Sequence, residues 1–424
     1  MKICMMTNTY LPHVGGVARS VSTFADEYRR RKHEVLVVAP AFDGPALSSR
    51  AEAIVERVPA IQHFNGSDFS VRLPLAAALS SRLDAFNADI VHAHHPFLLG
   101  DTALRVAVNK NVPVIFTHHT RYEDYTHYVP FDSPRLKEIA VNLSTQFANL
   151  CDGVIAPSES IARLLEQRGV TTPMRVVPTG IDVRAFSSGD GARFRQKMKL
   201  PRTAFVVGHV GRLAPEKNLD YLGEAVALFV KKQPRARFLV IGQGPGDGDL
   251  KAIFARHGIS DRLILAGSKT GRALADAYAA MDVFAFASQT ETQGLVVAEA
   301  MAAGLPVVAL NAPGVREVMR AGKNGFMPAA RAPARVFAAH LSRLATEPNV
   351  RRALGRGARA TAELFSRERC AAQAPAFYEL IRSSTRRARL LAYRSPWGIM
   401  LERMKVEWNL FTEKIQSVAQ VVVA

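Results

Sequence analysis

Two glutamates near the start of an apolar helical segment have the clearest chemical potential in this 424-residue sequence. Glu291 and Glu299 are separated by seven residues, and Gly294 lies between them. The run 295–303 is apolar and helix-forming, so we expect one carboxylate just before a helix and the other at least a turn into it. The first N–H groups of a helix have no partner within it and suit an anion. Here these groups would belong to Gly294, Leu295 and Val296.

This arrangement would suit a molecule that carries both hydroxyls and phosphates. Each carboxylate can accept hydrogen bonds from its own set of sugar hydroxyls, while the helix N–H groups hold phosphates between them. A nucleotide-sugar requires that layout. A plainer interpretation remains open from these residues alone: the helix dipole favours a glutamate at the start, and the second glutamate lies on the solvent-exposed face.

A second motif supplies cations. The segment 208–218, Gly-His-Val-Gly-Arg-Leu-Ala-Pro-Glu-Lys-Asn, follows a strand-like run. Arg212 can grip a diphosphate as a planar fork, and Lys217 can act as a point charge. Basic residues on the surface of a polar loop would give the same pattern, because basic residues are abundant in this chain.

Weaker signals lie in three other loops. The segment Val14-Gly-Gly-Val17 follows the first strand-like run and opens a helix, so Gly16 could approach a phosphate. His118 and His119 end another strand-like run, although a lone histidine is more often structural than catalytic. The segment 241–247, Ile-Gly-Gln-Gly-Pro-Gly-Asp, lacks GxGxxG spacing, and we interpret it as a turn that borders a nucleotide base.

Composition narrows the class of protein. The length suits two domains of roughly 190 residues each plus a tail. The formal charge of +18 implies an anionic partner such as nucleic acid, a membrane or nucleotide phosphates. No base-reading module is visible, so we expect no nucleic acid partner. Three distant cysteines suggest neither a disulfide framework nor a zinc site, as in a reducing cytoplasm. The N-terminus has the pattern of a first strand rather than a signal peptide.

Short apolar runs alternate with helical stretches, which predicts an α/β fold with doubly wound parallel sheets. The strand-like runs of the first half are 3–7, 34–39, 90–93, 114–117 and 153–156. The rhythm restarts after Pro201, with runs at 204–210, 237–241, 262–266, 283–287 and 306–310. We therefore predict two units joined around 182–200, a stretch rich in glycine and charge. Helical stretches 379–393 and 396–416 follow.

The sequence resembles a known family over about residues 1–380. The spacing of Glu291 and Glu299, together with Ala-Met-Ala-Ala-Gly-Leu-Pro-Val-Val at 300–308, is similar to the signature of retaining GT-B glycosyltransferases of family 4. The string Thr-Glu-Thr-Gln-Gly at 290–294 resembles the branch that glycosylates diacylglycerol. The resemblance implies two Rossmann-like domains facing across a cleft, with a C-terminal helical tail. We assign 1–185 to the acceptor-side domain, 200–370 to the nucleotide-sugar domain and 371–424 to the tail, part of which the resemblance implies crosses back to the N-terminal domain.

The resemblance also implies roles for the residues. Glu291 would bind hexose hydroxyls and Glu299 the ribose, while Arg212 and Lys217 would hold the diphosphate. Gly16 would contact phosphate, and His119 would lie at the reacting sugar, with His118 as the competing candidate. The sugar would be transferred with retention, by front-face attack of the acceptor hydroxyl. No Asp-x-Asp motif stands where a metal-dependent transferase needs one, so we predict that no metal or other cofactor is required.

We predict UDP-glucose as the donor and a membrane lipid such as 1,2-diacylglycerol as the acceptor. The segment 117–129, which contains Tyr-Glu-Asp-Tyr and His-Tyr, is similar to the diacylglycerol branch. Basic residues precede a segment with Trp, Leu and Phe at helical spacing, which is typical of an interfacial helix on anionic lipid. These basic residues are Arg382, Arg386, Arg387, Arg389 and Arg394. We expect a cytoplasmic monomer, peripheral on the inner face of the cell membrane, although the tail could instead pack on the protein.

Three alternatives stay open. The same donor site could serve a phosphatidylinositol, polyprenyl-linked or polysaccharide acceptor, for example with GDP-mannose. Two Rossmann-like lobes also describe a periplasmic solute receptor, which the carboxylate pair and the absence of a signal peptide disfavour. The third is a GT-B relative that isomerises or phosphorolyses sugars.

Overall fold

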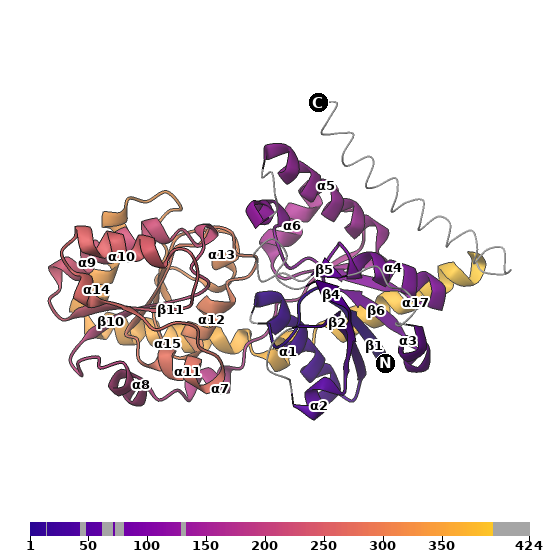
Figure 1. The fold of residues 1–424 in the computed structure, drawn as a ribbon, viewed down its shortest axis with the longest axis horizontal. Helices are drawn as coiled ribbons and strands as arrows, with labels where there is room; N and C mark the ends of the chain where they lie inside the picture. The colour runs from indigo at the N-terminus through magenta and orange to yellow at the C-terminus, as the bar shows by residue number, and fades with distance from the viewer. Residues whose placement is uncertain (14, 43–47, 62–70, 73–79, 129–132, 393–424) are drawn as a thin grey trace. The chain divides into compact units, whose positions relative to one another are not determined.

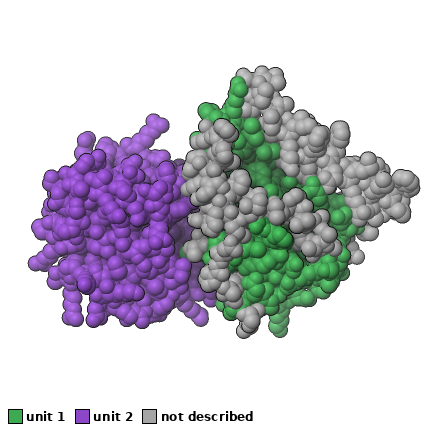
Figure 2. All heavy atoms as spheres, in the orientation of Figure 1, with its two compact units in different colours: residues 1–180, 368–424 green, residues 181–367 purple. Residues whose placement is uncertain are grey.

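The computed structural model describes residues 1–13, 15–42, 48–61, 71–72, 80–128 and 133–392. The chain forms two compact units, shown in different colours in Figure 2. Unit 1 comprises residues 1–180 and 368–424, and unit 2 comprises residues 181–367. Each unit has its own sheet and its own hydrophobic cores.

Unit 1 is built on a parallel sheet of seven strands in the order β3-β2-β1-β6-β7-β8-β9. Figure 1 labels β1, β2 and β6 of this sheet. The strands are β1 Lys2–Met6, β2 Glu34–Pro40, β3 Val55–Val58, β6 Ile90–Ala93, β7 Val114–Thr117, β8 Gly153–Ala156 and β9 Met174–Val176. A separate antiparallel pair joins β4 Ala60–Ile61 to β5 Val71–Arg72. The central strands are buried along their length because helices cover both faces of the sheet.

The helices of unit 1 form two layers. One core joins α4 Leu99–Lys110, α5 Pro134–Leu150 and α6 Glu159–Gln167 to the sheet. The other joins α1 Gly16–Arg30 and α17 Ala374–Ala392 to the opposite face, where Phe377 and Tyr378 pack near Phe24 and Tyr28. The shorter elements are α2 Ser49–Glu52, α3 Ser80–Phe86, α16 Arg367–Ala371 and the 3-10 helix η3 Tyr122–Tyr128.

The C-terminal helix α17 therefore belongs to the core of unit 1, although it follows unit 2 in the sequence. It covers most of the helical stretch predicted at 379–393. The second predicted stretch, 396–416, lies outside the described residues. No helix in the described ranges is both long enough and apolar enough to cross a membrane.

Unit 2 has a parallel sheet of six strands in the order β12-β11-β10-β13-β14-β15. The strands are β10 Phe205–Val210, β11 Ala236–Ile241, β12 Leu263–Leu265, β13 Val283–Phe286, β14 Val307–Ala309 and β15 Gly325–Phe326. The helices are α7 Val183–Ser187, α8 Gly191–Lys197, α9 Leu219–Lys232, α10 Asp247–Arg256, α11 Gly271–Ala279, α12 Leu295–Ala302, α13 Val315–Val318, α14 Ala334–Thr346 and α15 Pro348–Leu364. Two 3-10 turns are η4 Pro215–Lys217 and η5 Ser260–Arg262.

The stretch 182–200 differs from the predicted joint between units. It folds into α7 and α8, which pack on α11 of unit 2. The backbone N–H of Asp190 donates to Asp276 at 2.7 Å, and Phe194 is buried. The glycine content that suggested a linker instead permits close packing, because a Cβ on Gly189 would lie 2.2 Å from the carbonyl oxygen of Ala275.

Each of the two parallel sheets contains one point where the strand order reverses. In unit 1 it lies between β1 and β6, and in unit 2 between β10 and β13. In open parallel sheets, ligands bind beyond the carboxyl ends of the strands at such a switch point. The loops that follow these four strands are therefore the places to look for a site in each unit.

Candidate functional site

The loops after β10 and β13 are joined by an ion pair at the switch point of unit 2. The Nζ of Lys217 donates to Oε1 of Glu291 at 2.6 Å, and the two side chains are 15% and 17% exposed. The hydroxyls of Ser288 and Thr290 each donate to the carbonyl oxygen of Glu216 at 3.3 Å. Two sequence-predicted residues that lie 74 positions apart are thus in direct contact.

The electrostatics of this pair keep Glu291 ionised. Burial on its own would raise the pKa of the Glu291 carboxyl. The charge of the Lys217 ammonium and the hydrogen bond that it donates outweigh that effect and hold the pKa below its ordinary value. Glu291 is therefore an anionic acceptor, suited to hydroxyl donors, and Lys217 is a cation that shares the same small space.

Arg212 is oriented by a buried partner. Its Nη2 donates to Oε1 of Glu216 at 2.6 Å, and the Glu216 side chain is 2% exposed while that of Arg212 is 35% exposed. An arginine held in this way loses less side-chain entropy when it binds an anion, because its direction is already set. Arg212 and Lys217 both lie on the short segment between β10 and α9.

The start of α12 has the geometry that the sequence indicated. Gly294 precedes the helix with φ of +74°, a left-handed conformation that favours glycine. The N–H groups of Val297 and Ala298 both donate to the carbonyl oxygen of Gly294, so the intrahelical pattern begins there. The N–H groups of Leu295 and Val296 precede it, at the positively polarised end of the helix.

Glu299 lies in the second turn of α12 and is buried, with 1% of its surface exposed. Its Oε2 accepts a hydrogen bond of 2.9 Å from the hydroxyl of Tyr278 on α11. The alternative interpretation, which placed this carboxylate on a solvent-exposed helix face, is therefore wrong. A buried carboxylate needs hydrogen-bonding partners, and Tyr278 supplies one of them.

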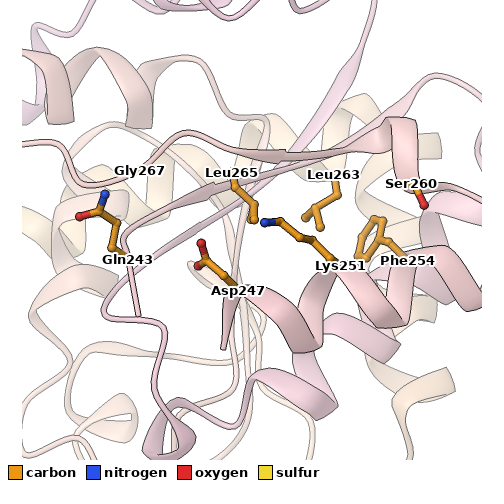
Figure 3. Close-up of a pocket in the computed structure, with 8 residues that line it drawn as sticks. All are labelled: Gln243, Asp247, Lys251, Phe254, Ser260, Leu263, Leu265 and Gly267. Atoms are coloured by element: carbon orange, nitrogen blue, oxygen red, sulfur yellow. The ribbon is translucent and has the colours of Figure 1, made fainter. Parts of the chain in front are cut away.

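A cavity of about 530 Å³ lies beside the glycine-rich loop after β11 (Figure 3). Figure 3 shows Asp247 and Lys251 along one side, with Leu263 and Leu265 across from them. Its other lining residues are Gln243, Phe254, Ser260 and Gly267. Oδ1 of Asp247 is buried without a hydrogen-bond partner in the described ranges, so the cavity offers an acceptor as well as apolar walls.

The same glycine-rich loop is tied to the loop that carries Arg212. The N–H of Leu213 donates to the carbonyl oxygen of Gln243 at 2.9 Å, and the N–H of Gly246 donates to that of Leu213 at 2.9 Å. Gly242 permits this approach, since a Cβ there would lie 1.8 Å from the carbonyl oxygen of Gly211. The cavity and the basic loop are therefore neighbours.

In unit 1, His119 follows β7 and contacts the end of β6. Its Nε2 lies 2.8 Å from Nδ1 of His94, and the two rings stack with centroids 5.1 Å apart. Burial lowers the pKa of His119 well below its usual value, and the neighbouring histidines lower it further. His119 is thus a neutral, partly exposed imidazole.

His118, the competing candidate, is completely buried. Its ring packs edge-on against Phe116 and Tyr122, and burial lowers its pKa to about 4. Neither ring nitrogen has a hydrogen-bond partner among the described residues. His118 is therefore a histidine of the hydrophobic core, and of the two only His119 is partly exposed.

Gly16 is the first residue of α1, which follows β1 at the switch point of unit 1. Gly15, just before it, is extended, and a Cβ on Gly16 would meet no atom of the described residues within 4 Å, apart from its chain neighbours and the backbone of its own helix. Val14, the first residue of the predicted motif, lies outside the described residues. Contact of Gly16 with a phosphate therefore stays a prediction.

Sequence reasoning missed a set of histidines next to His119. His92 and His94 are buried at the end of β6, and His95 follows them. The signal was present, because two histidine-containing segments each end a strand, and the carboxyl ends of parallel strands meet at one edge. The sequence did not show that β6 and β7 are adjacent. Within the described part of the chain, no group of three or more His, Cys, Asp or Glu could hold a metal ion.

Two parallel Rossmann-like sheets with a C-terminal helix are the fold of GT-B glycosyltransferases. A solved structure agrees with this class: the Anabaena HepE protein in complex with UDP-glucose has a TM-score of 0.70 and 23% identity, covering 89% of this chain and 99% of that one. A family model described as Glycosyltransferase Family 4 matches residues 14–185, and one described as Glycosyl transferases group 1 matches residues 190–361.

Curated relatives share both units. An alpha-monoglucosyldiacylglycerol synthase of Streptococcus pneumoniae is 31% identical over 73% of this chain and 71% of its own length. A GDP-mannose-dependent alpha-mannosyltransferase of Mycobacterium tuberculosis is 30% identical over 77% of this chain and 83% of its own length. The chain belongs to glycosyltransferase family 4 and is a hexosyltransferase that uses a nucleotide-sugar donor.

Proposed function

We propose that the protein transfers glucose from UDP-glucose to 1,2-diacylglycerol with retention of the anomeric configuration. The main support for a nucleotide-sugar donor is the contact of Lys217 with Glu291 beside the start of α12. It puts a cation and a hydroxyl-binding anion next to helix N–H groups. The acceptor is supported by likeness to relatives named alpha-monoglucosyldiacylglycerol synthase.

Each residue has a defined task in this proposal. Arg212, Lys217 and the N–H groups of Gly294, Leu295 and Val296 bind the diphosphate, with Gly16 contributing from the first domain. Glu291 binds hexose hydroxyls, Glu299 binds the ribose, and His119 hydrogen-bonds the hexose near the reacting carbon. Asp247 borders the base, and its carboxylate can accept a hydrogen bond from the N3–H of uracil.

The reaction proceeds on one face of the sugar. The acceptor hydroxyl forms a bond to the anomeric carbon as the bond from that carbon to the diphosphate oxygen breaks. The departing phosphate oxygen takes the hydroxyl proton. Arg212, Lys217 and the helix N–H groups stabilise the charge that grows on the leaving group, which also makes a metal ion dispensable.

The domain limits and the membrane contact belong to the same proposal. Unit 1 binds the acceptor and unit 2 binds most of the donor, while the enzyme acts as a monomer. The part of the tail beyond Ile381, the last α17 residue in the core of unit 1, adsorbs to anionic lipid on the cytoplasmic face. Arg386, Arg387, Arg389 and Arg394 supply the charge, worth about 1 kcal/mol each near an anionic surface. The proposed interfacial segment from Pro396 to Phe411 lies outside the described residues.

A matrix of donors and acceptors tests the reaction. Labelled UDP-glucose and GDP-mannose are each offered with diacylglycerol or phosphatidylinositol in anionic vesicles. Label from UDP-glucose in the diacylglycerol product supports the proposal, while label only from GDP-mannose, or only in phosphatidylinositol, overturns it. Glu291→Gln should abolish transfer, and Glu363→Gln, an exposed glutamate on α15, should leave it unchanged.

The second candidate is a mannosyltransferase that uses GDP-mannose, which the likeness to the Mycobacterium tuberculosis relative favours. The carboxylate of Asp247 does not decide between the two donors, because guanine also presents an N–H donor at N1. The same matrix separates the two candidates.

Vesicle flotation tests the tail. Replacing Arg386, Arg387, Arg389 and Arg394 by Gln should weaken binding to anionic vesicles at least tenfold, given about 1 kcal/mol for each charge. A matched control removes four exposed arginines from unit 2: Arg331, Arg335, Arg352 and Arg356. Equal weakening by both sets would mean that total charge, and not the tail, drives adsorption.

A further inference from the structure

We propose that His94 is a positioning residue that fixes the tautomer and the ring orientation of His119. The role of His119 at the sugar rests on the proposed function, but the tautomer is a property of the chain itself. The inference starts from the 2.8 Å contact between Nδ1 of His94 and Nε2 of His119. At this distance one nitrogen donates a hydrogen bond and the other accepts it.

The surroundings of His94 decide which nitrogen donates. His94 is completely buried, and its Nε2 has no hydrogen-bond partner in the part of the chain that the structure describes. If His119 donated, a neutral His94 would carry its proton on Nε2, which would bury an unpaired N–H. Buried N–H groups without a partner are rarer than buried acceptors without one. His94 therefore donates from Nδ1, and His119 accepts at Nε2.

Accepting at Nε2 places the proton of His119 on Nδ1. The hydrogen bond made by one imidazole nitrogen sets which nitrogen carries the proton, so the dyad holds one tautomer. Burial lowers the pKa of both His94 and His119 well below the usual value, which keeps the dyad neutral at physiological pH. The Nδ1–H of His119 is then a neutral donor, suited to a sugar oxygen.

The ring of His94 is itself held in place from behind. It packs against the ring of His92, with centroids 4.0 Å apart and the ring planes inclined by 36°. His92 makes two hydrogen bonds of 2.6 Å, one with the hydroxyl of Thr117 and one with the hydroxyl of Tyr378 on α17. His92 is thus held by β7 and by the C-terminal helix, and its fixed ring limits the rotation of His94 through direct packing. A group held this firmly can orient its neighbour.

The first experiment reads the tautomer directly. The full-length protein is prepared with ¹⁵N-labelled histidine, and the His119 signal is assigned by its loss in His119→Gln. The wild-type spectrum should show His119 protonated at Nδ1. In His94→Phe, which keeps a ring but removes the donor, the His119 signal should move toward the Nε2–H form. A wild-type His119 protonated at Nε2 overturns the proposal.

The second experiment separates positioning from folding. Asn places an amide nitrogen near the position of Nδ1, so His94→Asn can still donate to His119. We expect kcat to fall at least about tenfold in His94→Phe with KM within twofold, and His94→Asn to recover it to within about threefold of wild type. Equal losses in both variants, with equal thermal stability, overturn the proposal.

The two experiments fail in different ways. If the proposed sugar transfer is wrong, no donor and acceptor pair gives activity, yet the ¹⁵N spectrum still reports the tautomer. If the positioning role is wrong, transfer proceeds and the His119 tautomer is the same in wild type and His94→Phe. His257→Phe, which removes a histidine from unit 2 that contacts Glu224, serves as the control for general effects of losing an imidazole.

Discussion

The two units hold their candidate residues by different physical means. In unit 2, Lys217 and Glu291 form an ion pair of 2.6 Å, and Arg212 is paired with the buried Glu216. In unit 1, His119 meets His94 in a stack of imidazoles that burial keeps neutral. The candidate residues of unit 2 are held by ion pairs, and those of unit 1 are held by hydrogen bonds between neutral side chains.

This difference teaches what each unit can contribute to catalysis. Charges in a partly buried site stabilise a diphosphate strongly, but they respond to pH because their pKa values depend on one another. Neutral rings contribute direction rather than charge, so their effect should not change across the physiological pH range. The predictions below separate the two behaviours.

The largest effect is expected from removing the cation of unit 2. Lys217→Met should lower kcat/KM roughly 10²- to 10³-fold, because under the proposed function Lys217 stabilises the leaving group, and its loss also leaves Glu291 without a counter-charge. Steady-state rates with the active nucleotide-sugar measure this. Lys231→Met, an exposed lysine on α9, should stay within twofold. A loss below about fivefold for Lys217→Met would contradict a role for this charge at the diphosphate.

The stability of the same variant should depend on pH. The pKa of Glu291 lies below its ordinary value, so in the wild type its ionised form stabilises the fold above pH 4.5 and that contribution is lost as pH falls through the lowered pKa. Without Lys217, burial raises the pKa of Glu291 instead. The variant should be less stable than wild type by about 2–3 kcal/mol at pH 7, and the gap should narrow toward pH 4. Urea unfolding at several pH values tests this, and a constant gap would argue against it.

A smaller effect without pH dependence is expected in unit 1. Tyr378→Phe removes hydrogen bonds to His92 at 2.6 Å and to the hydroxyl of Tyr28 at 3.0 Å. The loss should be about 1–2 kcal/mol and constant from pH 5.5 to 8. Burial raises the pKa of Tyr378 well above 10 and lowers that of His92 to about 3, so neither changes charge in this range.

The control for Tyr378→Phe is Tyr221→Phe in unit 2. The Tyr221 hydroxyl is buried but has no hydrogen-bond partner among the described residues, so its loss should cost less than about 0.5 kcal/mol. Unfolding curves at pH 5.5 and pH 8 give both values. A pH-dependent loss in Tyr378→Phe would show that the imidazole stack of unit 1 carries charge after all.

The smallest effect on stability is expected at the start of α1. Among the described residues no atom beyond the local backbone would lie within 4 Å of a Cβ at Gly16, so Gly16→Ala should raise the free energy of unfolding by less than about 1 kcal/mol. If this helix start contacts phosphate closely, the added methyl should still raise KM for the nucleotide-sugar several-fold. Unchanged KM would remove Gly16 from the donor site.

Much of the architecture was predictable because it depends on local patterns. The buried strands of both sheets are short runs of apolar residues, so the βαβ rhythm and the restart after Pro201 were visible in the sequence. The glycine before α12 was visible for a similar reason, since a left-handed residue at a helix start favours glycine. The packing of 182–200 on unit 2 could not be predicted, because glycine occurs at close helix contacts as readily as in linkers.

The sequence by itself determined the residue types of the site and the elements that carry them. Only the tertiary structure decided which of these residues meet. The spacing along the chain does not encode the order of strands in a sheet, and that order brings Lys217 to Glu291 and His94 to His119. The tertiary structure also buried His118 and left His119 partly exposed, because adjacent residues in an extended segment point to opposite sides.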